Sequence, residues 1–279
     1  MTDLNLLMGQ LRDSSEEGSL LVIDGDAIAY MIGWFHRDHD DEELVKKAVD
    51  SWIREFFLLT SAARYIGVLS APSGSTMIRE QMYKFKKYKG NRKEKEDWVQ
   101  KWEPIINGHL ISAYGFIRVI DTWETDDYVT LASSVLRTND VPHKICSPDK
   151  DLKQIPGVHI DYRKTNAEQT GVLETVVNEE EANYNWCMQM LMGDATDNIA
   201  GIPGMGEKKA KDLLKDVDPM MWRNTVKLAY DKYFGEYYGN IIYNETVSAV
   251  TMLTWRIEKL SSQPAILELL FSNIQSVPI

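Results

Sequence analysis

The chain has 279 residues, of which 44% are hydrophobic and 26% are charged, with 17 Gly and 9 Pro. These proportions exclude collagen, low-complexity disorder and a disulfide scaffold, and the length allows one large domain or two smaller ones. The net charge of −11 argues against a protein that binds nucleic acid through its overall charge, but it leaves room for a local basic patch.

The two cysteines, Cys146 and Cys187, lie in apolar stretches and are expected to be buried thiols in a reducing compartment. No apolar run reaches the roughly 18 residues that a membrane-spanning helix needs. Residues 1–19 carry acidic side chains instead of the basic and apolar stretches of a secretory signal. The sequence therefore predicts a cytoplasmic protein that does not contact a membrane.

Short apolar runs alternate with longer stretches of helical periodicity in the first part of the chain. Strands are expected at residues 20–23, 65–69, 116–120, 144–146 and 158–160, and helices at residues 42–63 and 125–136. This alternation is typical of a mainly parallel sheet covered by helices. The pattern then changes to helices at residues 181–192 and from 207 onwards, so an all-α part is expected from residue 181 to the end.

Acidic residues follow the expected strands in short clusters, at the sheet edge where open α/β sheets bind ligands. A helix cap explains any one cluster, but several clusters that converge would repel one another unless a cation is present. Carboxylate oxygens without soft ligands suit Mg²⁺ or Mn²⁺, and this many acids suffice for two ions. The candidate metal ligands are Asp24, Glu124, Asp126, Asp127, Asp149, Asp151, Asp194 and Asp197.

A basic segment, residues 79–95, lies between the second and third expected strands and holds eight basic and two acidic residues. Aromatic residues lie among the cations, and this composition is typical of a groove that neutralises phosphates and stacks bases. A solvated charged helix is the structural alternative. The residues expected to contact nucleic acid are Arg79, Tyr83, Lys84, Lys86 and Lys87.

A glycine-rich turn, residues 201–206, follows the last acidic cluster and precedes a helix that begins near Glu207. Glycine lets a ligand approach the backbone closely, and free N–H groups at a helix start can hold a phosphate. The residues expected to grip a phosphate backbone here are Gly201, Gly204, Gly206, Lys208 and Lys209.

Taken in order, these motifs resemble the flap endonuclease and 5′-to-3′ exonuclease family, especially its bacteriophage members. The similarity extends from about Leu20 to Leu214, and the chain after Leu214 is assigned by position only. The motifs that carry the resemblance are Val22–Asp26, Tyr88–Arg92, Glu124–Asp127, Ser147–Asp151, Met192–Asn198 and Gly201–Gly206.

The resemblance implies a PIN-like α/β nuclease core in residues 1–180, with a helical arch at about residues 74–110. It also implies a helical DNA-binding region in residues 181–279. There, a helix–three-turn–helix motif at about residues 186–216 would grip duplex DNA through the glycine turn and its lysines. This motif often binds K⁺ in the family.

The family pattern also implies roles for single residues. A first metal ion would be held by Asp24, Glu124 and Asp126. The catalytic residues Lys89 and Arg92 would lie at the base of the arch and stabilise the scissile phosphate. The second ion would be held or surrounded by Asp149, Asp151, Asp194 and Asp197, with Asp127 beside both ions.

The sequence departs from the family pattern at the end of the second strand. The family usually places a metal-binding Asp there, a few residues before an Arg, whereas this chain has Ser70 and Ala71 before Arg79. Neither side chain replaces a carboxylate. The first ion is therefore expected to bind more weakly or to depend on Asp26 or water.

The sequence predicts a metal-dependent 5′-to-3′ exonuclease or flap endonuclease that hydrolyses DNA near 5′ ends, flaps or nicks, in replication or degradation. We expect a monomer in the cytoplasm, which would be that of a host cell if the source is a phage. Whether RNA–DNA hybrids are substrates stays open. Because Ala71 stands where the family has an Asp, a weakly active or non-catalytic protein that binds flap or nicked DNA is the alternative. A haloacid-dehalogenase-type phosphatase with Asp24 as nucleophile and a PIN-type ribonuclease are further alternatives.

Overall fold

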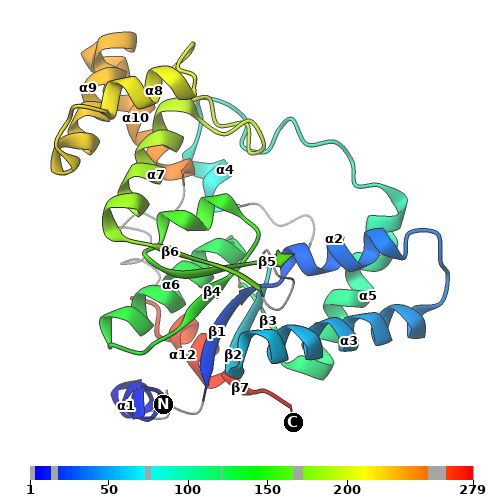
Figure 1. Ribbon diagram of the computed structural model, residues 1–279. Coiled ribbons are helices and arrows are strands. Elements are labelled where there is room, and N and C mark those ends of the chain that lie inside the picture. The colour runs from blue at the N-terminus through cyan, green and yellow to red at the C-terminus, as the bar shows by residue number, and fades with distance from the viewer. Residues whose placement is uncertain are drawn as a thin grey trace.

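The computed structural model describes residues 4–13, 18–72, 77–120, 122–165, 172–250 and 262–278. At its centre lies one sheet (Figure 1), with the strands β1 (Ser19–Asp24), β2 (Ala62–Leu69), β3 (Ile117–Arg118), β4 (Lys144–Cys146), β5 (Gly157–Thr165), β6 (Val172–Val177) and β7 (Gln275–Ser276). The strand order is β3-β2-β1-β4-β5-β6, and β7 pairs with β2 outside this path. The pairs β5–β6 and β2–β7 are antiparallel and the others are parallel, so the predicted mainly parallel sheet is confirmed.

Helices cover both faces of the sheet, and each face has its own apolar core. Successive side chains of β1 point alternately into the two cores. Leu20 and Val22 belong to the first core, together with side chains of α1 (Leu4–Asp13), α6 (Thr125–Thr138) and α12 (Pro264–Ser272). Leu21 and Ile23 belong to the second core, with α2 (Asp26–Phe35), α3 (Glu42–Thr60) and α5 (Asp97–Tyr114). A strand that is apolar on both faces is the usual signature of a buried parallel sheet.

The expected strands all appear, but some boundaries differ. Helix α3 ends at Thr60, because Ser61 adopts a left-handed φ of 49° and β2 begins at Ala62. Strand β6 was not predicted; it pairs antiparallel with β5 and forms one edge of the sheet. Helix α2 was not predicted either, and it packs in the second core with α5, most of which lies within the range of the predicted arch.

Within the helical arch that the resemblance implied at about residues 74–110, the basic segment does not form a continuous helix. Helix α4 (Ile78–Met82) precedes it and α5 follows it, while the described residues 83–96 form turns and extended chain without a helix. Two features disfavour a helix here. Tyr83 and Tyr88 both point into one core at a spacing of five residues, which does not match one helical face, and Lys89 has a left-handed φ of 53°.

The helices between residues 179 and 249 form a third core, which also includes Tyr83 and Tyr88. They are α7 (Glu179–Met192), α8 (Glu207–Leu214), α9 (Trp222–Phe234) and α10 (Glu236–Ala249). Residues 194–205 form turns between α7 and α8. The described helices include none with both the length and the apolar character needed to cross a membrane.

The end of the described chain returns to the sheet, which the sequence did not predict. Helix α12 buries Ile266, Leu270 and Phe271 in the first core, and β7 pairs with Arg64 and Tyr65 of β2. The predicted helical C-terminal part is confirmed by α7 to α10 and α12, and among the described residues the short strand β7 is the departure from it.

Candidate active site

Three carboxylates meet at the start of α6, and we term them the Glu124 group: Glu124, Asp126 and Asp127. Each places a carboxylate oxygen within 4.8 Å of those of the other two. Asp127 Oδ2 also accepts a hydrogen bond from the Glu124 N–H at 3.1 Å, which holds the first turn of the helix in place. The helix start thus brings like charges together.

A buried arginine offsets the charge of the Glu124 group. Arg79 lies on α4 and is 1% exposed. Its guanidinium contacts Glu124 and lies 2.9 Å from Asp126 Oδ2 and 3.0 Å from Asp127 Oδ1. The prediction that Arg79 contacts DNA is therefore wrong, because three acids hold this side chain inside the protein.

A second set of carboxylates, termed the Asp24 group, comprises Asp24, Asp149, Asp151 and Asp194. Asp24 ends β1, and Asp149 and Asp151 follow β4, so parallel strand ends bring them together. Ser147 connects the two strand ends: its hydroxyl donates to Asp24 Oδ2 at 2.7 Å and accepts from the Asp149 N–H at 3.0 Å.

Asp194 follows helix α7, and Gln189 of that helix connects it to Asp151 of this group by hydrogen bonds. Gln189 Nε2 donates to Asp151 Oδ2 at 2.8 Å and to Asp194 Oδ2 at 3.5 Å. Lys150 Nζ also lies 2.8 Å from Asp194 Oδ2. Asp194 Oδ1 accepts from the Thr196 N–H at 2.7 Å, so the same carboxylate shapes the turn after α7.

Burial and neighbouring charges shift pKa values upward for some carboxyls and downward for others within each group. Burial, with Asp26 next, raises the pKa of Asp24 to about 7, and burial with Asp149 and Asp194 raises the pKa of Asp151 to about 6. Burial alone would also raise the pKa of Glu124, but Arg79 and Lys89 outweigh it, and the pKa is about 2. Burial, with Asp127 and Glu124, also raises the pKa of Asp126 despite Arg79, whereas Lys150 outweighs burial and lowers the pKa of Asp194. Both groups therefore hold carboxylates whose repulsion the neighbouring cations relieve only in part.

The end of β2 contributes a hydroxyl instead of a carboxylate. The Ser70 N–H donates to Asp26 Oδ1 at 2.8 Å, and the Ser70 hydroxyl contacts Asp26 Oδ2. Thr125 Oγ1 donates to Asp26 Oδ2 at 2.9 Å, while Ala71 packs against the first core. Asp26 thus connects the end of β2 with the starts of α2 and α6.

The two predicted catalytic cations lie at the Glu124 group. Lys89 Nζ contacts Glu124 and lies 3.9 Å from Asp197 Oδ2, and Arg92 Nη2 lies 2.8 Å from Asp197 Oδ1. The buried Tyr88 hydroxyl bonds Asp197 Oδ2 at 2.8 Å and Glu124 Oε2 at 3.1 Å. The structure therefore places Asp197 beside Glu124, although the resemblance grouped it with the second ion.

The basic segment is fastened to the loop that carries Asp197. The Lys89 N–H donates to the Asp197 carbonyl at 2.9 Å, and the Ala200 N–H donates to the Tyr83 hydroxyl at 2.9 Å. Tyr83 is 1% exposed, so the prediction that it contacts DNA is wrong: its ring packs in the third core. The remaining lysines of the segment are exposed, and their contact with DNA stays a prediction for Lys84, Lys86 and Lys87.

The glycine turn divides into a buried and an exposed part. Gly201 is buried and packs against Gly193, so its lack of a side chain has a structural reason. Gly204 and Gly206 are exposed, and α8 begins after Gly206 without a side-chain cap. Lys209 Nζ donates to the Gly204 carbonyl at 2.8 Å. The free helix start, with the exposed Lys208 beside it, stays a candidate phosphate site.

The donor atoms of the Asp24 group suit a hard divalent cation by their chemistry, whereas the Glu124 group is the one among the described residues that places three ligand atoms within 4.8 Å of one another. All of them are carboxylate oxygens, which Mg²⁺ and Mn²⁺ prefer. Within the part of the chain that the structure describes, Lys150 is the cation that forms an ion pair with this group. The Glu124 group has the same donor chemistry, but Arg79 already binds its oxygens.

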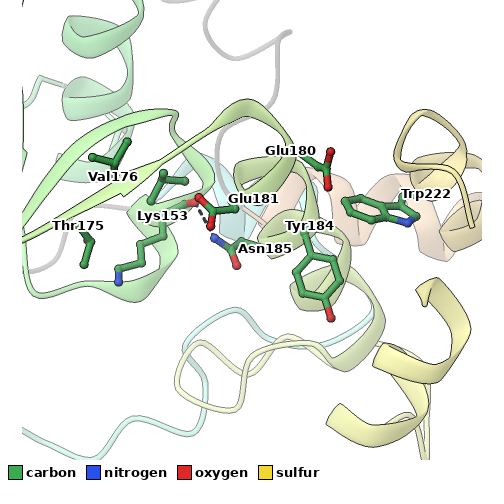
Figure 2. A pocket seen from close by; sticks show the side chains of 9 residues that line it. Lys153, Thr175, Val176, Glu180, Glu181, Tyr184, Asn185 and Trp222 are labelled. Atoms are coloured by element: carbon green, nitrogen blue, oxygen red, sulfur yellow. Dashed lines mark hydrogen bonds between the residues drawn. The ribbon is translucent and has the colours of Figure 1, made fainter. Parts of the chain in front are cut away.

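A large cavity lies away from the carboxylates. Its volume is about 600 Å³, and Lys153, Thr175, Tyr184, Asn185 and Trp222 are among its lining residues. Figure 2 shows the side chain of Asn185 beside Lys153, whose carbonyl accepts its hydrogen bond at 2.9 Å. None of the predicted site residues lines this cavity, so its size gives no support to a site there.

Sequence reasoning missed three polar residues that hold the acids: Ser147, Gln189 and the hydroxyl of Tyr88. Ser147 lies inside a motif that carries the resemblance, so its position was the available signal. Gln189 lies within a helix without any motif, and its role follows from the packing of α7 against residues 150–154.

A PIN-like, resolvase-like nuclease core is the class of protein that this sheet and its acidic edge define. Residues 19–184 match the family described as "5′-3′ exonuclease, N-terminal resolvase-like domain". The chain belongs to this 5′-3′ exonuclease family.

Curated relatives are consistent with this assignment. DNA polymerase I of Bacillus subtilis is 28% identical over 214 residues, which are 73% of this chain and 24% of that protein. The 5′-3′ exonuclease of Mycoplasma pneumoniae is 27% identical over 218 residues, which are 70% of this chain and 71% of that protein. The matched region thus spans about a quarter of the polymerase relative.

Solved structures confirm the fold. A bacteriophage T5 protein co-crystallised with metal ions has a TM-score of 0.62 at 14% identity, over 91% of this chain and 98% of that chain. The T5 flap endonuclease in a pseudo-enzyme–product complex with DNA and metal ions has a TM-score of 0.60 at 14% identity, over 91% and 97%. The predicted PIN-like sheet and helical second part are therefore correct.

Proposed function

We propose that the protein hydrolyses DNA phosphodiester bonds near free 5′ ends with divalent metal ions, as an exonuclease, a flap endonuclease or both. The observation that carries this proposal is that eight carboxylates lie in or beside two groups at the carboxyl end of the sheet, with Lys89 and Arg92 paired to acids there. Membership of the 5′-3′ exonuclease family supports it. The T5 flap endonuclease, solved with DNA and metal ions, shares the fold.

The metal ions and the basic residues would have separate roles in such a reaction. Bound Mg²⁺ or Mn²⁺ ions would activate an attacking water and neutralise the leaving oxygen. Lys89 and Arg92 add positive charge beside Asp197, where they would face the charge that grows on the scissile phosphate. The exposed lysines of the basic segment and the start of α8 would hold phosphates, so cleavage is expected to follow DNA structure more than base sequence.

Several finer expectations stay predictions: K⁺ at the turn of residues 201–206, action on RNA–DNA hybrids, a monomeric state and a cytoplasmic location. Family membership favours nuclease chemistry over a haloacid-dehalogenase phosphatase. A PIN-type ribonuclease and a DNA-binding protein without cleavage would give distinct results in one assay.

The assay uses a 5′-labelled flap duplex, a nicked duplex and a matched RNA strand, each with Mg²⁺, Mn²⁺ or EDTA. We expect short 5′ products from DNA with either ion and none with EDTA. The double variant Asp149→Asn/Asp151→Asn should lose cleavage yet keep DNA binding, because it removes metal ligands and leaves the basic segment intact. Asp140→Asn is the matched control, since this exposed residue has a φ of 53° that Asn tolerates.

Unchanged turnover in the double variant, or cleavage that continues in EDTA, would refute the metal-dependent mechanism. Tight binding of the flap without cleavage in either ion would establish the non-catalytic alternative. Preferential cleavage of the RNA strand would favour the ribonuclease.

A further inference from the structure

The buried guanidinium of Arg79 has no part in the activity proposed above. It reaches three carboxylates, and its Nε atom is buried without a hydrogen-bond partner among the described residues. A buried charge is costly unless it is paired. The acids of the Glu124 group are therefore what keeps Arg79 in place, and Arg79 in turn neutralises them.

The two carboxylate groups differ in how far cations offset their charge. The Glu124 group and the neighbouring Asp197 together have four acids. Three cations pair with these acids: Arg79, Lys89 and Arg92. The Asp24 group also has four acids, but among the described residues it pairs with Lys150 only, whose side chain is 73% exposed. The unrelieved negative charge is thus concentrated in the Asp24 group.

An ion and the guanidinium would compete for the same oxygen atoms. Mg²⁺ binds carboxylate oxygens at about 2.0–2.1 Å, so an ion in the Glu124 group would lie next to Arg79. Two cations repel strongly at such a distance when they are shielded from water. Ser70 and Ala71 at the end of β2 add no carboxylate that could compensate.

We propose that Arg79 is the resident counter-cation of the Glu124 group, so that the protein takes up its first divalent ion at the Asp24 group. The Glu124 group accepts an ion only when the guanidinium is withdrawn. Arg79 is thus a positioning residue that sets the order of metal binding. This inference rests on the proposed function, because it concerns the ions of that reaction.

The order of binding is tested by titrating the full chain with Mn²⁺ in the absence of DNA. Calorimetry and electron paramagnetic resonance measure how many ions bind and how tightly. The wild type should bind one ion tightly. Asp151→Asn should weaken that site at least about tenfold, whereas Asp126→Asn should leave it unchanged, since each variant removes a ligand from one group only. A tight ion that survives Asp151→Asn and is lost in Asp126→Asn would overturn the inference.

Variants of Arg79 test its role directly. Arg79→Gln should gain a second Mn²⁺ ion without DNA, while Arg79→Lys, which keeps the positive charge, should still bind one. Arg137→Gln is the control, since this exposed arginine pairs with Glu179 away from both groups. A single ion in Arg79→Gln would contradict the inference, and if this variant does not fold, the comparison of Asp126→Asn with Asp151→Asn decides.

Failure of the inference and failure of the proposed function give different results. Two equally tight ions in the wild type would overturn the order of binding and leave the metal-dependent nuclease standing. A wild-type chain that binds no Mn²⁺ would overturn both.

Discussion

Gly193 and Gly201 are in direct contact where the chain leaves α7 and turns back. A Cβ on Gly201 would lie 2.3 Å from the Gly193 nitrogen, and one on Gly193 would lie 2.2 Å from the Ile199 carbonyl oxygen. Both glycines also have a positive φ, of 75° at Gly193 and 58° at Gly201. This contact closes the loop that holds Asp194 and Asp197, so the two glycines shape the site without touching a ligand.

Gly201→Ala should destabilise the protein by about 3 kcal/mol, because the new methyl group meets backbone atoms at a left-handed position. Urea unfolding measures the change. Gly108→Ala is the matched control: Gly108 lies in α5, and among the described residues no atom outside the adjoining helical backbone lies within 4 Å of where its Cβ would be. This control should gain up to about 1 kcal/mol. Equal stability of Gly201→Ala and the wild type would refute the packing argument.

The sequence allows many of the site residues to be identified, but not all of their partners. The acids follow apolar strands or begin helices, so their place at one edge of the sheet could be predicted from chain order, whereas Lys89 and Arg92 were assigned from the family resemblance. Arg79 and Tyr83 were assigned to DNA because their neighbours are basic. Their burial follows from the acids of α6 and from the third core, which lie far away in the sequence.

The basic segment and the Asp194–Ala200 loop form one structural unit. Asn198 Nδ2 donates to the Lys87 carbonyl at 2.9 Å, and Asn91 Nδ2 donates to the Ala195 carbonyl at 2.6 Å. Asn198 has a left-handed φ of 59°, which Asn tolerates better than most residues. The helical part of the protein therefore positions Lys89 and Arg92.

Asn198→Ala should destabilise the protein by about 2 kcal/mol, through the lost hydrogen bond and the cost of a left-handed alanine. Cleavage of the flap duplex should fall by about tenfold, because small displacements of catalytic groups are costly. Binding of Mn²⁺ should not change. Asn224→Ala, at an exposed position of α9, should alter neither, and an unaltered cleavage rate in Asn198→Ala would argue against the positioning role.

At the level of elements, periodicity predicts the central strands and helices α3, α6 and α7. The helical arch was predicted from the family and not from these residues. Lysine repulsion and the spacing of Tyr83 and Tyr88 oppose a helix here. The antiparallel edge strand β6 depends on pairing with β5, and local patterns do not report such pairing.

Segments that are distant in the sequence connect the three cores of the molecule. Tyr83 and Tyr88 enter the third core from the region between α4 and α5, and α12 enters the first core from the far end of the chain. The division at residues 180 and 181 stays a prediction, but the cores do not follow it. Sequence motifs end near Leu214, so the return of α12 could not be predicted from them.

Leu270→Ala should destabilise the protein by about 3 kcal/mol, because Leu270 is fully buried in the first core and its truncation leaves a cavity. Thermal or urea unfolding monitored by tryptophan fluorescence gives the value. Leu228→Ala on α9, where the side chain is 57% exposed, should change stability by less than about 0.5 kcal/mol. Equal effects of the two variants would show that α12 is not part of the core.

Strand β7 pairs with Arg64 and Tyr65, in the first half of β2, and the Arg64 guanidinium donates to the Leu11 carbonyl of α1. The first and last described elements, α1 and β7, thus lie at the opposite end of β2 from Ser70. In Figure 1 this is the side away from α8 and α9. An immobilisation tag or a fluorophore attached after β7 would therefore leave the acidic edge open to solution. Surface-tethered, single-molecule measurements can be built on that attachment point.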